Sequence, residues 1–337
     1  MKKKLLALCL VMVMLCCPLS VMAADDAPAG GSRAGEELRF VVVPKCVHAW
    51  FDLVYMGAIR EANKLNELTG MKIKVEYNAP SSTDVTEQNT ILQQVAATQP
   101  AGILLDPNDF DGSKAILDEI KEQGIEVVLF DAPPADGYSS AGCDFIEMGT
   151  MAATALVEAL DGKGKVAIMM GVPTAPNHTQ RYEAEKAVLE QYPDIEIVAE
   201  GVDNDDIETA QSQMASIIAA HPDLDGMLCC NASGPIGIAN AIKEAGLEDQ
   251  IYAVGMDGIQ EILDAVKEGA LDESVASIPQ KQGSMGCLLL FQAITGLNDM
   301  PKEIDTGINH ITQDNIDQYL QELADLYALL EVEGVQE

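Results

Sequence analysis

The sequence lacks the short motifs of the common enzyme classes. There is no G-x-S-x-G nucleophile motif, no H-E-x-x-H zinc motif, no phosphate-binding Walker loop and no glycine-rich dinucleotide fingerprint after the first predicted strand. Of the four histidines, only His48 and His178 lie near predicted strand ends, and neither has the spacing of a metal ligand. We therefore expect no cofactor, no metal site and no catalytic residues.

Basic residues are also scarce. The 337 residues include 20 Lys and Arg against 54 Asp and Glu, which gives a net charge of −34. A surface this acidic repels nucleic acids and anionic lipids, so neither is an expected partner. The charge is compatible with a well-solvated exported protein and does not identify a ligand.

Cysteines are few once the amino terminus is set aside. Beyond residue 23 only five remain, and they are odd in number, scattered and without C-x-x-C spacing. This argues against a disulfide framework and a structural zinc site. Cys229 and Cys230 end an apolar run and are expected to be small buried hydrophobic residues.

The one conspicuous apolar segment lies at the amino terminus. Three lysines precede an apolar run over residues 5–17, and small or medium residues at 21–23 fit a signal peptidase site. We predict a signal peptide over 1–23, cleaved after Ala23, whereas a bilayer span needs ~20 apolar residues. Cleavage as a lipoprotein before Cys16 or Cys17 is disfavoured because Leu15 and Cys16 suit such a site poorly. Loss of the three lysines leaves a net charge of −37, and residues 24–37 are predicted to be a flexible leader.

From residue 38 onward, short apolar runs alternate with helix-length amphipathic segments. Several runs are apolar at every position, which is typical of parallel strands covered by helices on both faces. The segment 206–221 shows the helical pattern clearly, with apolar residues three and four positions apart. The predicted strands are 38–43, 72–77, 101–106, 125–130, 165–170, 195–200, 225–230 and 251–256, and the predicted helices are 53–69, 86–98, 112–123, 147–161, 179–191, 206–221, 235–246 and 258–269.

Eight strand–helix repeats are compatible with a closed eightfold barrel or with two open, doubly wound sheets. The turn-rich stretch 132–146, which contains one further short strand candidate, divides the repeats into two groups of four. This division favours an α/β fold with two parallel-sheet lobes. In open parallel sheets, ligands bind beyond the carboxyl ends of the strands.

The residues that directly follow the apolar runs are polar or aromatic. Such a mixture suits a sugar, because paired polar groups satisfy hydroxyls and an aromatic ring packs against the C–H face of the ring. Trp50 is the only tryptophan in the chain, and we expect it to contact the ligand. Burial against the following helix would be an alternative role for Trp50, and helix capping or a turn would be the alternative for Asp131 and Asp257. The candidates are Lys45, His48, Trp50 and Phe51 after the first run, Asp131 after the fourth, Arg181 after the fifth, 203–205 after the sixth, Asn231 after the seventh and Asp257 after the eighth.

Four segments resemble type I periplasmic binding proteins, and the ribose-type sugar-binding group in particular. They are VVVPKCVHAWFDLVYMGAIREANKL (41–65), VVLFDAP (127–133), AAHPDLDGMLCCNASGPIGIANAI (219–242) and YAVGMDG (252–258), and the resemblance extends from about residue 38 to 327. It implies two lobes joined by three hinge crossings, near 142–145, 277–281 and 305–310. The implied lobes are 38–143 plus 279–307 and 144–278 plus 308–337.

The resemblance also implies roles for individual residues. It places His48, Trp50 and Phe51 on the sugar-contacting positions of the first lobe and Asp131 on the hydroxyl-binding position. Polar contacts of the second lobe are implied at Arg181, Asn231 and Asp257, with Ser277 or Gln280 contributing near the hinge. Asn204 matches a position that is aromatic in ribose-type members.

Other positions depart from the ribose type. Ala132 follows Asp131 where an Arg is usual, which together with Asn204 puts ribose itself in doubt. Pro44 and Lys45 resemble the rhamnose and autoinducer-2 branches, in which this Lys reaches the ligand. The Asp-Gln pair of autoinducer-2 binders is replaced here by Asn177 and His178. A pentose, hexose or deoxyhexose is therefore expected, with autoinducer-2 or a polyol as the alternative.

The resemblance implies delivery of the ligand to the permease and ATPase of an ABC importer. Export is expected from the signal peptide, and a monomer is expected because a clamp needs both lobes free to move. A ligand-presenting subunit of a chemoreceptor or sensor would use the same cleft and stays open as an alternative. An exported glycosidase or isomerase is a weaker one, supported only by the possibility that Asp131 and Asp257 flank a bond. A repressor is excluded by the export signal and by the lack of a basic helix-turn-helix.

Overall fold

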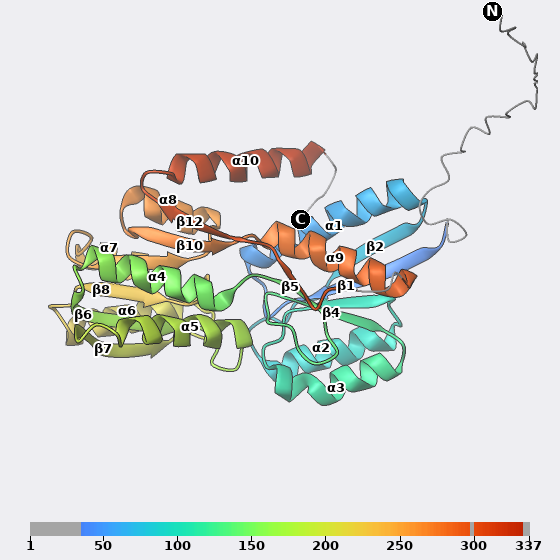
Figure 1. Ribbon diagram of the computed structural model, residues 1–337, viewed down its shortest axis with the longest axis horizontal. Coiled ribbons are helices and arrows are strands. Elements are labelled where there is room, and N and C mark those ends of the chain that lie inside the picture. Colours follow the sequence, from blue (N-terminus) through green and yellow to red (C-terminus); the bar gives the residue numbers. More distant parts are fainter. Residues whose placement is uncertain (1–34, 297–299, 333–337) are drawn as a thin grey trace, which may run out of the picture.

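The computed structural model describes residues 35–296 and 300–332, which form two α/β lobes lying side by side (Figure 1). The predicted signal peptide and residues 24–34 of the predicted leader lie outside the described residues. The first strand begins at Glu37, one residue earlier than expected. Within the described ranges, no helix is both long enough and apolar enough to cross a bilayer.

The first lobe is built on a six-stranded sheet with the order β11-β5-β4-β3-β1-β2, in which every pairing is parallel. Helices α1 and α9 cover one face, and α2 and α3 cover the other (Figure 1). The elements are β1 (Glu37–Val43), α1 (Ala49–Thr69), β2 (Lys72–Tyr77), α2 (Val85–Ala97), β3 (Gly102–Leu105), α3 (Phe110–Glu122), β4 (Glu126–Phe130), β5 (Ser140–Gly142), α9 (Pro279–Thr295) and β11 (Glu303–Asp305).

The second lobe repeats this plan. Its sheet has the order β12-β10-β9-β8-β6-β7, and only the edge strand β12 is antiparallel to its neighbour. The elements are α4 (Phe145–Ala159), β6 (Lys163–Met170), α5 (Pro176–Leu189), β7 (Asp194–Val202), α6 (Ile207–Ala220), β8 (Gly226–Cys229), α7 (Gly234–Ala245), β9 (Tyr252–Met256), α8 (Gln260–Glu268), β10 (Glu273–Ser277), β12 (Ile308–Thr312) and α10 (Ile316–Val332).

The chain passes between the lobes three times. The crossings lie between β5 and α4, between β10 and α9, and between β11 and β12. The predicted fold class, two doubly wound lobes with three crossings, is confirmed. Since both sheets have the same order and their first four strands run parallel, the carboxyl ends of β1, β3 and β4 face those of β6, β8 and β9 across the gap (Figure 1).

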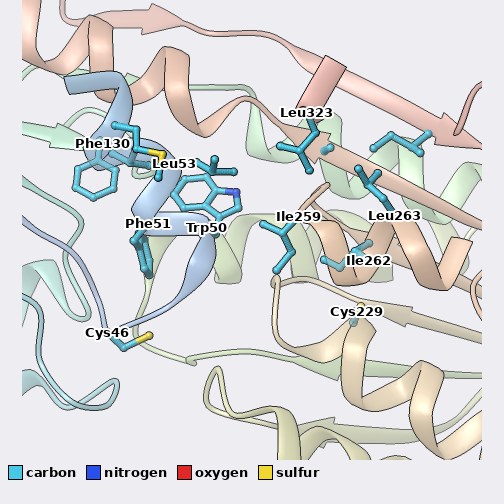
Figure 2. Close-up of a cluster of buried hydrophobic side chains, with 14 of the residues drawn as sticks. Cys46, Trp50, Phe51, Leu53, Phe130, Cys229, Ile259, Ile262, Leu263 and Leu323 are labelled. Atoms are coloured by element: carbon cyan, nitrogen blue, oxygen red, sulfur yellow. The ribbon is translucent and has the colours of Figure 1, made fainter. Parts of the chain in front are cut away.

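One apolar cluster runs through both lobes. It includes Trp50 and Leu53 of α1 together with Ile259 and Leu263 around the start of α8, and Leu323 of α10 lies in the same cluster (Figure 2). The lobes therefore share buried apolar surface on the side of α10. The cysteines Cys46, Cys143, Cys229, Cys230 and Cys287 are free and buried, and burial was predicted for Cys229 and Cys230.

Helices α1 and α9 approach so closely that a side chain at Gly283 has no room. A Cβ atom built there would lie 1.9 Å from the Val54 carbonyl oxygen of α1. We expect Gly283→Ala to lower the free energy of unfolding by about 1–3 kcal/mol, because the Val54 carbonyl cannot move aside without separating the two helices. Urea unfolding measures the change.

The matched control is Lys281→Ala, on an exposed position of the same helix. It should change stability by less than about 0.5 kcal/mol. Equal stability of the Gly283→Ala and Lys281→Ala proteins would contradict the close helix contact.

Candidate functional site

The facing strand ends enclose a small cavity between the lobes. Its lining combines ionisable, aromatic and small polar side chains from both lobes. Several of these residues were candidates from the sequence. The lining residues are Lys45, Cys46, His48, Trp50, Phe51, Asp131, His178, Arg181, Asp205, Ala232, Ser233 and Asp257.

Asp131 is the most heavily bonded residue of the cavity. It follows β4 in the left-handed backbone region, with φ of 43°, a conformation in which Asp and Asn are enriched. Its Oδ1 accepts a hydrogen bond from Arg181 Nη2 at 3.1 Å. Its Oδ2 accepts from Asn177 Nδ2 and Lys45 Nζ at 2.5 and 3.5 Å. Since Arg181 and Asn177 belong to the second lobe, these bonds join the two lobes through the site.

Lys45 is buried beside two carboxylates. Its Nζ lies 2.9 Å from Asp106 Oδ2 and 3.5 Å from Asp131 Oδ2. Burial alone would lower the pKa of Lys45, but the carboxylates of Asp106, Asp131 and Asp205 outweigh it and raise the pKa. The ammonium group is therefore held charged at the floor of the cavity. Asp106 is fully buried behind it and fixes its position.

A further hydrogen bond joins Trp50 of the first lobe to Asp257 of the second. Trp50 Nε1 donates a hydrogen bond to Asp257 Oδ1 at 3.1 Å. The Ser277 hydroxyl donates to the same oxygen at 2.7 Å. Burial raises the pKa of Asp257, and the nearby Arg181 guanidinium offsets part of this rise. Asp257 follows β9 as Asp131 follows β4, and it also has a positive φ, of 72°.

Helix α5 brings Arg181 and His178 to the cavity. The helix can approach α4 closely because a Cβ at Gly149 would lie only 2.2 Å from the Arg181 carbonyl oxygen. Arg181 Nη1 also donates to the Cys230 carbonyl at 3.3 Å, and its guanidinium stacks over the Phe145 ring. Burial would lower the pKa of Arg181, but Asp131 and Asp257 raise it, so the group stays charged.

His178 is buried and neutral. Burial, together with the charges of Lys45 and Arg181, holds its pKa well below the ordinary value. Its Nδ1 accepts a hydrogen bond from the Val172 backbone N–H at 2.9 Å, so the proton resides on Nε2. Nε2 faces Asp205 Oδ2 at 3.8 Å, which is beyond hydrogen-bond range.

Asn231 lies just behind the cavity wall. Its Nδ2 donates to Asp203 Oδ1 and to Asp205 Oδ1, both at 2.7 Å. Burial and the neighbouring Asp205 carboxylate raise the pKa of Asp203 to about 8, although hydrogen bonds from Asp205 N and Asn231 offset part of the rise. The folded protein therefore holds this proton more tightly than the unfolded chain does.

It follows that the contribution of Asp203 to stability is present at low pH and is lost as the pH rises towards 8. We expect Asp203→Asn, which mimics the protonated form, to raise the melting temperature much more at about pH 9 than at about pH 5. Thermal unfolding of both proteins at the two pH values measures the difference. Parallel shifts at both values would contradict a raised pKa at Asp203.

The candidate ligand-binding residues from the sequence lie at different distances from the cavity. Lys45, His48, Trp50, Phe51, Asp131, Arg181 and Asp257 line it. Ser277 and Asn231 lie behind the lining and bond its carboxylates. Asn204 has an exposed side chain, and only its carbonyl contacts the first lobe, through the Thr83 hydroxyl at 2.7 Å. Gln280 lies on α9 and lines grooves outside the cavity.

Three residues of the site were missed. Asp106, Asn177 and His178 bond or line the cavity, yet they were not among the candidates. Asn177 and His178 lie in the first turn of α5, ahead of the candidate Arg181. Of the candidate range 203–205, Asp205 is the residue that lines the cavity. Inspection of the last residue of each predicted strand, as well as the residues that follow it, would have found Asp106.

The lobes are closed upon each other in this structure. The cavity volume is about 20 Å³, room for a molecule the size of water. Besides the Asp131 and Asp257 contacts, the Thr174 hydroxyl donates to the Asn108 carbonyl across the gap at 2.8 Å. Entry of any larger molecule therefore requires these interlobe bonds to break.

Comparison with known proteins gives consistent matches over most of the chain. A family model described as a periplasmic binding protein domain matches residues 39–298. The xylose/arabinose-binding protein XylF of Sulfolobus acidocaldarius is 25% identical over 268 residues, which are 73% of this chain and 65% of that protein, just under two thirds of its length. The ribose import binding protein RbsB of Bacillus subtilis is 23% identical over 259 residues, covering 75% and 81% of the two chains.

The crystal structure of an ABC transporter solute binding protein from Burkholderia graminis, in complex with D-arabinose, has the same fold. It superposes with a TM-score of 0.78 at 26% identity and covers 84% of this chain and 97% of that one. These matches cover most of both lobes and are not confined to a single motif.

Proposed function

The chain belongs to the periplasmic binding protein family, and from this premise we propose that it captures a small sugar between its lobes for an ABC importer. The observation that carries the proposal is the interlobe cavity, in which an indole, two buried cations and several carboxylates from both sheets converge. Relatives named for xylose, arabinose and ribose support a monosaccharide as the ligand class.

The side chains suit a polyhydroxy ring. Asp131 and Asp257 accept hydrogen bonds from hydroxyls, while Lys45 and Arg181 donate to hydroxyl oxygens. Trp50 and Phe51 present aromatic surface to the C–H groups of the ring. In the closed form, the polar side chains bond one another across the gap, for example Arg181 to Asp131. A sugar would replace these bonds with its own hydroxyls.

The proposed mechanism is hinge closure. In an open form the carboxylates and cations are solvated, and the ligand bonds to both lobes only when they close. The lobe boundaries 38–143 plus 279–307 and 144–278 plus 308–337 are the rigid bodies that we propose for this motion. Closure changes the outer surface, and a permease can distinguish the closed, loaded form.

We further propose that the protein is exported, that the signal peptide is cleaved after Ala23, and that the mature protein works as a monomer with a permease and its ATPase. No turnover of the ligand is expected. Delivery to a chemoreceptor or sensor uses the same cleft, and gene neighbours that encode a permease and ATPase rather than a kinase would decide for transport.

Calorimetry of the mature protein against pentoses, hexoses, deoxyhexoses, polyols and autoinducer-2 tests the proposal. We expect saturable heat with one or a few sugars and no product after prolonged incubation. No saturable heat with any member of the panel would argue strongly against sugar capture, and product formation would indicate an enzyme.

A further inference from the structure

We propose that the interlobe cavity prefers a polyhydroxy ligand that carries a protonated amine, such as an amino sugar, over its neutral parent. The proposal rests on the proposed function, and it specifies the substrate class of the same site. It predicts that two carboxylates, Asp205 and Asp257, receive the ammonium group.

The charges around the cavity do not balance. Lys45 and Arg181 are the two cations of the lining, and Asp131, Asp205 and Asp257 are its carboxylates. Asp106 adds a fourth carboxylate against Lys45. His178 is neutral, and His48 accepts a hydrogen bond from the Trp50 backbone N–H through Nδ1. Burial raises the pKa of Asp106 well above its ordinary value, although Lys45 offsets part of the rise. With Asp131, Asp205 and Asp257 ionised, the lining holds one more negative charge than positive ones, and an ionised Asp106 would add a second.

The excess charge is located on particular atoms. Asp106 and Asp131 share Lys45, and Asp131 is also bonded by Arg181, so these two carboxylates are compensated. Asp257 is 3% exposed, and the bonds it accepts from Trp50 and Ser277 all end on Oδ1, so Oδ2 is available to a ligand.

Asp205 resembles Asp257 in this respect. Its Oδ1 accepts a hydrogen bond from Asn231 Nδ2 at 2.7 Å. The neutral His178 Nε2 lies 3.8 Å from its Oδ2, and the Lys45 ammonium, whose pKa Asp205 helps to raise, forms its ion pairs with Asp106 and Asp131 instead. The side chain of Asp205 is 8% exposed, so water compensates its charge poorly once the lobes close. Each of the two carboxylates therefore offers one oxygen to a cation from the ligand.

The electrostatics of the surroundings agree with this arrangement. Burial raises the pKa values of Asp257 and, behind Asn231, of Asp203, because loss of water disfavours the ionised carboxyl, and the neighbouring carboxylates Asp131 and Asp205 add to the respective rises. A protonated amine at this place would lower the free energy of the ionised carboxylates, whereas a carboxylate or phosphate on the ligand would be repelled.

A metal ion does not fit the same role. Across the part of the chain that the structure describes, no three His, Cys, Asp or Glu side chains are grouped so that they could hold one. The hydroxyl-bonding groups and the Trp50 indole beside the carboxylates favour an organic cation that also carries hydroxyls and an apolar face.

The test is calorimetry of the mature protein at about pH 6 against matched triplets. Each triplet is an amino sugar (D-glucosamine, D-galactosamine or D-mannosamine), its neutral parent hexose and its N-acetyl derivative, and neutral pentoses and sugar acids complete the panel. We expect the tightest ligand to be an amino sugar, with a Kd at least about tenfold below those of its parent and its N-acetyl derivative. Asp205→Asn should reduce the ratio between amino and parent affinities by about tenfold or more.

A neutral sugar or a sugar acid as the tightest ligand would overturn this inference and leave sugar capture standing. A preference for the amino sugar that Asp205→Asn and Asp257→Asn both leave unaltered would also overturn it, because the charge would then be recognised elsewhere. Absence of binding across the whole panel would count against the proposed function and this inference together.

Discussion

Replacement of Asp131 by Asn is expected to weaken sugar binding by about 1000-fold while the protein still folds. In the proposed complex the Asp131 carboxylate accepts hydrogen bonds from ligand hydroxyls beside the buried cations Lys45 and Arg181, and a neutral amide does neither job as well. A hydrogen bond to a charged group contributes about 1.5–3 kcal/mol, so two of them contribute about 3–6 kcal/mol, a range that includes the ~4 kcal/mol corresponding to 1000-fold in Kd. Calorimetry with the best ligand of the panel measures the loss.

Asn is chosen because it tolerates the left-handed backbone of residue 131, with φ of 43°, better than Ala does. Asp161→Asn is the matched control, since Asp161 also has a positive φ, of 51°, but is exposed and precedes the amino end of β6, at the opposite end of that strand from the cavity. Its affinity should equal that of the wild type. Binding by Asp131→Asn within about threefold of the control would remove Asp131 from the site.

Replacement of Trp50 by Ala is expected to lower both ligand affinity and stability. The indole is 3% exposed and belongs to the apolar cluster that joins the lobes (Figure 2). It also donates a hydrogen bond to Asp257 Oδ1. Removal of a buried aromatic residue costs about 3–5 kcal/mol of stability. Loss of the aromatic surface and of the bond to Asp257 should weaken sugar binding by about 100-fold or more.

Trp50→Phe separates the two contributions. It keeps an aromatic ring in the cluster but removes the Nε1–H donor, so we expect most of the stability to return and a binding deficit of about tenfold to remain. Urea unfolding and calorimetry on the same samples give both quantities. If Trp50→Ala lost stability but bound sugar normally, Trp50 would be a plug for α1 and not a ligand contact.

The sequence was informative where a single local rule applies. The strand over 72–77 was predicted with its observed ends, because alternating residues between a glycine and a turn leave little choice of boundary. Asp131 and Asp257 were correctly placed at the gap, since both directly follow apolar runs whose parallel pairing brings their ends together. The two-lobed fold class followed from the grouping of the repeats around 132–146.

Features that depend on packing between distant segments were not accessible in this way. Helix α9 was not predicted as an element because Gly283 and Gly286 weaken its helical pattern, and the close contact with α1 that requires Gly283 is a tertiary feature. Asp106 was hidden at the end of the predicted strand 101–106, and only its ion pair with Lys45 reveals its role. Nor can sequence position indicate that the side chain of Asn204 faces solvent while that of Asp205 lines the cavity.

The most direct test of the account is a fluorescence titration that uses Trp50, the only tryptophan in the chain, as a reporter inside the cavity. If a sugar enters the gap between the lobes, its addition should shift the emission of Trp50 saturably, with the same Kd as calorimetry, and Asp131→Asn should abolish the shift. A sugar that calorimetry shows to bind tightly while the emission of Trp50 stays constant would mean that the ligand binds elsewhere, and the interlobe account would be wrong.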